Sequence, residues 1–527
     1  MHNMTRFRPR ILFKLAIALW VLSLVSCVPF RQFRDNKPGD ARRQDTFVPQ
    51  SSFCLNNEHK PTGHDYYLGF IEFDDMGELW DQKKDNQLEH VKQLIDKAKQ
   101  KSLDCGQDGR IQTVTFIHGW KNNASDDTGN VWGFRQALEE GICDRYYRAH
   151  PTSSTLPEQT SGPCASAKKE FQNQRPAKED PIPLVGIFIG WRGNVTNVPV
   201  IKEFTFWDRR DAAIRIPGPS LTAVLHDIMD RTKACLDPKD TNYETCPGSN
   251  SSALVVGHSF GGMVMERALA QAMVERILDA EQSMPKQAME AASGRPQHVH
   301  VDPCENGSAL SDSDHHLRPP ADLIIFVNSA APATESRQTL TFLKDRQIYF
   351  CGVNPTALES DLKHRYREQP LFLSITSKGD TATNFAMPIG QYPSYITKSF
   401  RKYDPPEPLE IPKQSTYYMH STANLAPLQS HSITGCSDED LKNVPPGTHD
   451  IRITINGKHY CIIRKWDHKN EKDVWNTTPY WIMQMPADIV PDHGTIFTNE
   501  FQKLLAQLLY QFDNHAQKAG LKPHFTK

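Results

Sequence analysis

Seven short, nearly continuous apolar runs recur along this chain of 527 residues, with patterns typical of helices between them. Such runs are typical of strands that are buried on both faces of a parallel sheet. The helical patterns are clearest over 87–101, 261–278 and 499–518. Strand and helix alternate over about 450 residues, which predicts an α/β fold with a mostly parallel, doubly wound sheet. The expected strands span 66–73, 113–117, 184–189, 253–256, 323–327, 371–376 and 480–485.

Four polar segments between these elements are longer than such a fold requires. We interpret them as insertions in one domain that spans residues 61–520, because apolar runs resume after each of them. The last contains Asn456-Gly457 between two alternating runs, 451–455 and 458–466, which predicts a β-hairpin with a type I′ turn. A separate small subdomain at 391–476 is the alternative. The four insertions span 145–182, 233–250, 281–319 and 391–476.

The first 26 residues have the layout of a secretory signal peptide. A basic stretch precedes the apolar run 15–25, which is too short for a comfortable membrane span. The tetrapeptide Leu24-Val25-Ser26-Cys27 resembles the lipobox of bacterial lipoproteins, which implies acylation of Cys27 as the new N-terminus. An ordinary signal or a short anchor is the alternative. We therefore expect an exported lipoprotein that faces the periplasm or the cell surface, with the outer membrane favoured over the inner, and with residues 27–60 as a tether outside the fold.

Cysteine count and charge restrict the chemistry further. Without Cys27, ten of the eleven cysteines remain, and an even number in an exported chain favours disulfides over buried free thiols. No CxxC pair occurs, which disfavours a metal site. The 60 basic and 62 acidic residues nearly balance, so nucleic acid is not an expected partner. The simplest disulfides join Cys143 to Cys164, Cys235 to Cys246 and Cys436 to Cys461.

The strongest chemical signal is the motif Gly257-His258-Ser259-Phe260-Gly261. It follows the apolar run 253–256 and opens the helical pattern 261–278. A strand, a sharp turn and a helix in this order hold a serine in a strained turn, and the flanking glycines allow strand and helix to approach closely. Here the sequence resembles the α/β-hydrolase superfamily over roughly residues 65–515. The resemblance implies the fold of that superfamily and the chemistry of serine esterases and lipases, without a cofactor.

A serine hydroxyl needs a base, and the base needs an orienting acid. The chain order expected from the resemblance is serine, acid, histidine. Asp380 follows the run 371–376, and His493 lies between the last expected strand and the last helix, so we predict these two as acid and base. Glu335, after the preceding strand, is the alternative acid. Each of these residues could instead be an ordinary loop residue, since the chain has 21 histidines and Asp380 lies in a turn-like sequence.

The oxyanion of such a reaction needs two hydrogen-bond donors. The N–H of Phe260, directly after the predicted nucleophile, is one. The sequence His118-Gly119-Trp120 follows the expected strand at 113–117 and resembles the His-Gly motif of lipases and esterases. By that resemblance the Trp120 N–H is the second donor and His118 shapes the loop.

The residues around the motif indicate an apolar substrate. Several aromatic residues follow expected strands, where they would line an apolar acyl site or pack beneath the loops. The segment 206–213 resembles one in bacterial members of the superfamily, and its charges would contact substrate or pair with one another. Residues 312–316 carry metal-capable side chains, but a solvated loop is the favoured interpretation. The aromatic residues are Trp120, Trp132, Phe134, Trp191 and Phe260.

Together these patterns predict a serine hydrolase that cleaves carboxylic or thio esters with Ser259, His493 and Asp380. A lipid anchor favours a lipid-like ester, and the expected partners are an ester or lipid and the membrane; no protein partner is indicated. Two alternatives stay open: an acyltransferase with the same residues, and a non-catalytic surface lipoprotein that binds a partner through its insertions.

Overall fold

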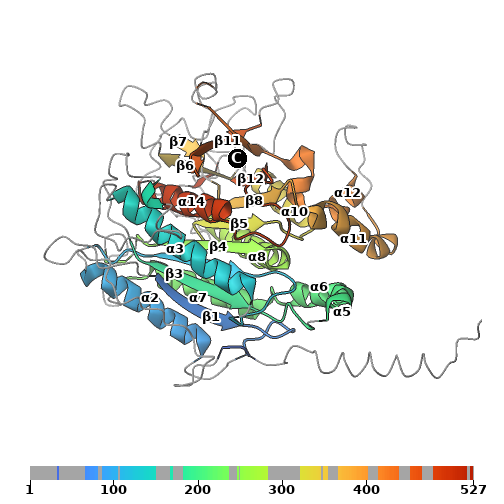
Figure 1. Ribbon diagram of the computed structural model, residues 1–527, viewed down its shortest axis with the longest axis horizontal. Helices are drawn as coiled ribbons and strands as arrows, with labels where there is room; N and C mark the ends of the chain where they lie inside the picture. The colour runs from blue at the N-terminus through green and yellow to red at the C-terminus, as the bar shows by residue number, and fades with distance from the viewer. Residues whose placement is uncertain are drawn as a thin grey trace, which may run out of the picture.

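A computed structural model gives the three-dimensional structure (Figure 1). The expected signal peptide (residues 1–26), Cys27, residues 312–316 and much of the four insertions lie outside the described residues. In the described part of the chain, no helix is both long and apolar enough to cross a membrane. The structure describes residues 32–34, 66–80, 86–104, 107–126, 128–149, 167–169, 182–196, 198–236, 246–248, 250–282, 321–345, 348–353, 366–368, 370–400, 413–437, 439, 451–465, 479–518 and 523–525.

A seven-stranded sheet forms the centre of the molecule, in the order β1-β3-β2-β4-β5-β8-β12. Every neighbouring pair in it is parallel, so all the carboxyl ends lie on one edge. The seven apolar runs all form strands of this sheet, which confirms the α/β class and the parallel sheet. The strands are β1 (Tyr66–Glu72), β2 (Gln112–Ile117), β3 (Leu184–Gly190), β4 (Ser252–His258), β5 (Leu323–Val327), β8 (Phe372–Ser377) and β12 (Tyr480–Met485).

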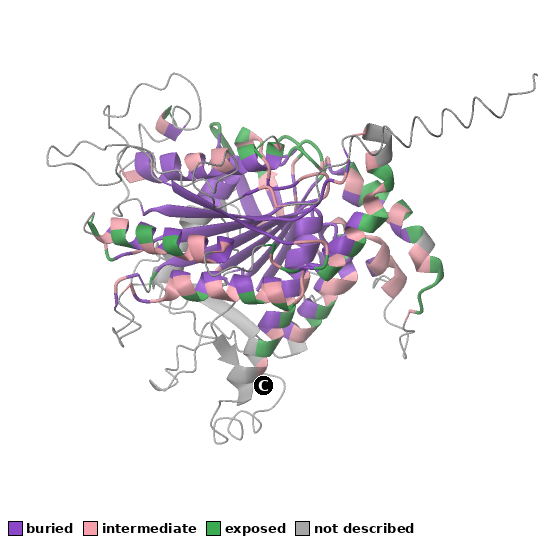
Figure 2. Cartoon of the chain, turned by 90° about the horizontal axis from the view of Figure 1, so that it is seen from below, coloured by how far each residue is buried: buried purple, intermediate pink, exposed green. Residues whose placement is uncertain are grey.

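Helices cover both faces of the sheet, as Figures 1 and 2 show. Strand side chains alternate between two apolar cores: Leu184 and Phe188 of β3 point to one, whereas Val185 and Ile187 point to the other. The first core also contains α3 (Gly129–Ala149) and α14 (Asn499–Lys518). The second contains α2 (Gln87–Asp104), α7 (Pro219–Lys233), α8 (Phe260–Gln282) and α10 (Ala333–Asp345).

The predicted hairpin is present in the last insertion. Strands β10 (Ile451–Ile455) and β11 (Lys458–Arg464) pair antiparallel, and β9 (His431–Gly435) adds a third strand. The turn residues Asn456 and Gly457 have φ angles of 51° and 77°, as a type I′ turn requires. Apolar side chains of the hairpin share the core of α14, so the hairpin packs on the main sheet. A further small sheet has the order β13 (Pro523–Phe525), β6 (Ile348–Val353) and β7 (Tyr366–Glu368).

Two of the predicted disulfides are confirmed. Cys235 bonds Cys246 just before β4, and Cys436 bonds Cys461 of β11. Cys143 is also disulfide-bonded, and Cys164 lies outside the described residues.

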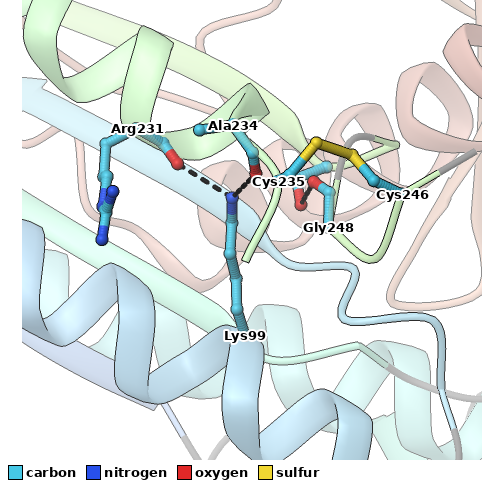
Figure 3. Close-up of a disulfide and its surroundings, with 7 residues drawn as sticks. Lys99, Arg231, Ala234, Cys235, Cys246 and Gly248 are labelled. Atoms are coloured by element: carbon cyan, nitrogen blue, oxygen red, sulfur yellow. Dashed lines mark hydrogen bonds between the residues drawn. A yellow bond between two sulfur atoms is a disulfide. The ribbon is translucent and has the colours of Figure 1, made fainter. Parts of the chain in front are cut away.

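Beside the first disulfide, the buried Lys99 of α2 reaches the end of α7 (Figure 3). Its Nζ donates to the carbonyls of Arg231 and Ala234 over 2.8 and 2.5 Å. Burial and the nearby charge of Arg231 lower the pKa of Lys99 to about 7. The lysine thus satisfies carbonyls that the helix end leaves open and joins α2 to α7.

The start of the described chain differs from the expected tether. Residues 32–34 are held against the sheet, and Arg34 is 1% exposed. The amides of Phe33 and Arg34 donate to the carboxylate of Glu72 over 2.9 and 2.8 Å. The Arg34 guanidinium bonds the Ala124 carbonyl and both carboxylate oxygens of Asp126. The sequence did not predict this contact, because a short polar segment carries no periodicity. Its hydrogen-bond acceptor, Glu72, lies far along the chain at the end of β1.

A buried glutamate predicts how stability depends on pH. Glu266 of α8 bonds the hydroxyls of Ser336 and Tyr480, and burial, with the nearby Glu335 carboxylate, raises its pKa to about 8. Between these two pKa values, Glu266 keeps its proton in the folded chain, whereas in the unfolded chain it loses the proton above its ordinary pKa of 4.5. The free energy of unfolding should fall as pH rises between those values. Denaturant unfolding at pH 5 and pH 8 should show a smaller fall for Glu266→Gln; equal falls would contradict this protonation state.

Candidate active site

Ser259 lies in a strained turn between β4 and α8. Its φ is 57°, which is in the left-handed region that residues other than glycine seldom adopt. A Cβ at Gly257 would lie 2.8 Å from the Gly261 carbonyl, and one at Gly261 would lie 2.1 Å from the Ile117 carbonyl. The two glycines therefore permit the close approach of strand, turn and helix, and β4 and α8 point Ser259 out over the carboxyl edge of the sheet.

The three residues predicted to act together are within hydrogen-bond distance in series. Ser259 Oγ lies 2.7 Å from Nε2 of His493, and Nδ1 of His493 lies 3.0 Å from Oδ2 of Asp380. The Asp380 side chain is fully buried, whereas 25% of the His493 side chain is exposed. With Nδ1 protonated toward Asp380, Nε2 can accept the serine proton.

The carboxylate of Asp380 is held by more than the histidine. Thr383 donates to it twice, from its amide over 3.0 Å and from its hydroxyl over 2.6 Å. Burial alone would raise the pKa of Asp380, but the hydrogen bonds from His493 and Thr383 outweigh it, and the pKa is lowered. Asp380 is therefore ionised near neutral pH. The alternative acid, Glu335, instead pairs with Arg267 of α8 at 3.0 Å, whereas His493 Nδ1 is bonded by Asp380.

Two loops meet closely to bring Asp380 and His493 together. A Cβ at Gly379 would lie 2.1 Å from the Pro491 carbonyl, so glycine is required at this crossing. Asp492 caps its own turn by accepting from the amides of Gly494 and Thr495, each over 2.8 Å. These contacts fix the backbone on both sides of His493.

Asn328 is a positioning residue that the sequence did not single out. It follows β5 with a φ of 46°. Its Oδ1 accepts the amide of Ser377 over 2.9 Å, and its Nδ2 lies 3.3 Å from the Asp492 carbonyl. Asn328 thus ties the end of β8 to the loop that carries His493. An asparagine directly after an apolar run, where left-handed backbone is tolerated, was the signal available.

His258 supports the same loop from the motif itself. Its Nε2 lies 2.8 Å from the His493 carbonyl, and the two rings are 5.2 Å apart. Burial, followed by the charge of His493, lowers the pKa of His258 to about 3. A neutral ring at position 258 donates from Nε2 and places no fixed cation beside the histidine predicted as base.

The loop after β2 lies directly against Ser259. A Cβ at Gly119 would be 2.5 Å from the serine Cβ and 3.1 Å from its Oγ. The Gly119–Trp120 peptide and the Phe260 amide therefore come close to the serine from two elements, and their role as oxyanion donors stays a prediction. In the part of the chain that the structure describes, no backbone bond outside helices and strands uses either amide.

His118 is buried and shapes this loop. Its Nδ1 lies 2.8 Å from the Gly119 carbonyl, and its Nε2 accepts the amide of Trp191 over 3.1 Å. Trp191 in turn donates from its ring to the His118 carbonyl over 2.9 Å. Burial lowers the pKa of His118 to about 4, so the ring is neutral and locks the loops after β2 and β3 together.

We predict that Gly119→Ala lowers kcat/KM by about 100-fold without unfolding the chain, because the added methyl group displaces either the serine or the donor peptide. Kinetics with a soluble ester and a thermal unfolding curve would measure the two effects. Gly129→Ala is the matched control, since nothing lies within 4 Å of a Cβ there. Equal kcat/KM for the two variants would show that the loop after β2 has no part in the reaction.

Aromatic side chains gather on one side of Ser259. The ring of Phe206 is 5.3 Å from both Trp120 and Phe260. Phe206 begins α6 (Phe206–Arg215), which follows α5 (Pro199–Phe204) in the segment after β3. Of the five aromatic residues expected to line the site or to pack beneath the loops, Phe134, Trp191 and Phe260 are buried, Trp120 is partly buried, and Trp132 is exposed.

The charges of segment 206–213 pair with neighbouring groups. Arg209 is buried and contacts Asp75 at 2.7 Å and Asp208 at 2.5 Å. It also donates to the Arg192 carbonyl over 2.9 Å. These bonds give Arg209 a structural role that joins α6 to the loops after β1 and β3.

Metal-capable groups do not cluster within the described ranges: three or more such side chains nowhere come together in them. None of the protein-family models matches this chain, and no curated protein or solved structure matches it significantly.

Proposed function

We propose that this protein is a serine hydrolase of the α/β-hydrolase type that cleaves carboxylic or thio esters. The observation that carries the proposal is the series of hydrogen bonds from Ser259 through His493 to Asp380. The strained φ of Ser259 and the order serine, acid, histidine after β4, β8 and β12 support it.

The proposed reaction has two steps that use the same groups. His493 Nε2 accepts the proton of Ser259 while Oγ attacks the ester carbonyl, and the amides of Phe260 and Trp120 stabilise the oxyanion. His493 then gives the proton to the alcohol or thiol as the ester bond breaks, and the acyl group remains on Ser259. In the second step His493 activates water, which attacks the acyl carbonyl and regenerates Ser259. The ionised Asp380 stabilises the positive charge on His493 in both steps.

The surroundings support an apolar acyl group as substrate. Trp120 and Phe206 are partly buried against Phe260, the residue after the serine, and aromatic surface favours acyl chains over charged groups. A quarter of the His493 side chain is exposed, so water can reach this histidine in the second step.

Hydrolysis of p-nitrophenyl esters of two to sixteen carbons by the purified protein tests this function. Turnover that peaks at a medium or long chain and is absent in Ser259→Ala is the expected result. Adding a primary alcohol as acceptor would reveal an acyltransferase by the appearance of a new ester. No turnover of any ester by the folded wild type would contradict the proposal and favour a binding role.

We further propose that Cys27 carries the acyl groups of a bacterial lipoprotein and anchors the chain to a membrane. The disulfides support export, because such bonds persist in oxidising compartments. Metabolic labelling with an alkyne palmitate analogue should mark the wild type and not Cys27→Ala. Equal labelling of the two would contradict the anchor.

A further inference from the structure

Large apolar side chains that are exposed share one location in the described part of the chain. All of them follow carboxyl ends of the parallel sheet, and their exposed fractions run from 38% to 74%. They therefore surround the edge on which Ser259 lies, which we call the carboxyl edge. Exposed apolar side chains that gather on one side of a molecule mark an interaction surface. Met76 and Trp80 follow β1, Trp132 follows β2, Phe204 and Trp207 follow β3, and Phe385, Ile389, Tyr392 and Ile396 follow β8.

The densest part of this surface is a helical segment directly after Asp380. It consists of the π-helix η2 (Ala382–Ala386) and α11 (Met387–Ile396). Four exposed apolar residues follow one another at intervals of four, three and four, which places them on one helical face. Segment 382–396 contains no Asp, Glu, Lys or Arg. Only its exposed apolar face resembles a helix of a membrane interface, and the absence of charge lowers the cost of bringing this face into the headgroup region.

This apolar helical face continues into the aromatic group beside Ser259. Trp207 donates from its ring to the Gly390 carbonyl over 3.3 Å. A Cβ at Gly390 would lie 3.3 Å from the ring of Phe206, which itself contacts Phe260. An apolar chain that leaves a lipid layer at α11 would therefore meet Phe206, which packs against the residue next to the serine.

A row of aromatic rings, three of them tyrosines, fits the headgroup region of a bilayer as the occupant of this face. The rings of Tyr392, Tyr395, Phe400 and Tyr418 form a row with centroid distances of 6.0, 5.3 and 5.7 Å. The Tyr418 hydroxyl also bonds Ser394 of α11 over 2.7 Å. Rings with a polar tip concentrate at the headgroup level of bilayers, because one end is apolar and the other is solvated.

Three ion pairs lie on the carboxyl edge. Lys121 contacts Glu203 at 2.6 Å beside the aromatic group. Arg209 contacts Asp75 at 2.7 Å, and Arg34 contacts Asp126 at 2.6 Å. Paired charges lose less hydration energy than isolated ones when they approach a surface of low dielectric constant.

The N-terminal segment connects the same edge to the start of the chain. Phe33 and Arg34 bond Glu72 at the carboxyl end of β1, and Arg34 bonds Ala124 after β2. The apolar run 15–25 and Cys27 precede Gln32 by seven and five residues. Even fully extended, such lengths span only about 25 and 18 Å. An apolar or acylated N-terminus in a bilayer would therefore keep the carboxyl edge near that bilayer.

We propose that the carboxyl edge is the membrane-facing surface of this protein, with the apolar face of segment 382–396 in the headgroup region of a phospholipid bilayer. Residues 32–34 fix this orientation by holding the N-terminus to the sheet. This orientation does not depend on a reaction at Ser259. It extends the proposed function, because it places the serine where an ester in the bilayer would reach it.

Quenching of a site-specific fluorophore tests the orientation in the full chain, reconstituted in vesicles of phosphatidylethanolamine and phosphatidylglycerol. One label is placed at Ile389→Cys and a matched one at Gln100→Cys, in the part of α2 that leads to the opposite edge. Phospholipid with a nitroxide near its headgroup should quench the label at 389 and leave that at 100 unquenched. Equal quenching would overturn the proposal. Access of aqueous iodide to both labels, without nitroxide quenching, would also overturn it and leave a protein as occupant.

A triple variant, Phe385→Gln with Ile389→Gln and Ile396→Gln, tests the link to the proposed hydrolysis. Hydrolysis of an ester embedded in vesicles should fall about tenfold or more, because the apolar face no longer partitions into the interface. Turnover of a soluble short ester should stay within about twofold, since these side chains face solvent. A control variant replaces Gln93, Lys97 and Gln100 of α2 by alanine. Equal losses on both substrates would contradict the proposal, whereas absence of any hydrolysis would affect only the proposed function.

Discussion

Ser259→Ala should lower kcat/KM for a soluble ester by about 10⁵-fold or more, because the variant has no nucleophile and no acyl-enzyme can form. The fold should be unaffected, since only one hydroxyl oxygen is lost from a residue whose backbone bonds stay in place: its amide donates to Val327 and its carbonyl accepts from Ala330. Steady-state kinetics at high enzyme concentration, beside a thermal unfolding curve, measure both effects.

Ser329→Ala is a suitable control for the serine variant. Ser329 lies near the same turn, with its Oγ 2.9 Å from where a Cβ at Gly262 would lie, and it has no predicted role in the reaction. Its kcat/KM should stay within about tenfold of the wild type. Turnover by Ser259→Ala within tenfold of the wild type would contradict a nucleophilic serine.

Asp380→Asn should lower kcat by about 10⁴-fold, since an amide cannot stabilise a positively charged His493 and can favour the wrong tautomer of its ring. The loss should exceed the effect of removing a hydrogen bond alone, because the carboxylate is fully buried beside the histidine. The ratio of kcat between variant and wild type is the quantity to measure.

Glu335→Gln separates the two candidate acids. Glu335 pairs with Arg267 between α8 and α10, so its loss should affect stability and leave kcat nearly unchanged. A drop in kcat for Glu335→Gln that equals the drop for Asp380→Asn would show that the orienting acid has been wrongly assigned.

Much of the fold could be predicted because each central strand carries its own signal. β3 and β4, for example, are continuous apolar runs that are buried on both faces. By contrast, α3 has no clear apolar stripe, since polar residues such as Glu140 and Arg145 are buried within it. Gly133 of α3 is required by a contact with a distant segment, because a Cβ there would lie 2.4 Å from Phe497. Contacts between distant segments set these residues, and local patterning cannot reveal them.

Ser259, Asp380 and His493 could be predicted because each follows a strand in the order that the resemblance implies. The residues that hold these three in place could not be predicted. Thr383 holds Asp380 from the first turn of a helical segment, and Asn328 holds the His493 loop from the end of a different strand. Such hydroxyl and amide contacts depend on where several loops meet, for which a single sequence offers no spacing rule.

Mass spectrometry of the full chain after reaction with a fluorophosphonate tests the proposed nucleophile most directly. We predict one adduct, located on the peptide that carries Ser259, and its absence in Ser259→Ala. Labelling of His493→Ala should be much slower, because the serine then lacks its base. No adduct on the folded wild type, or an adduct on another residue that persists in Ser259→Ala, would contradict the assignment of Ser259 as a nucleophile activated by His493 and Asp380.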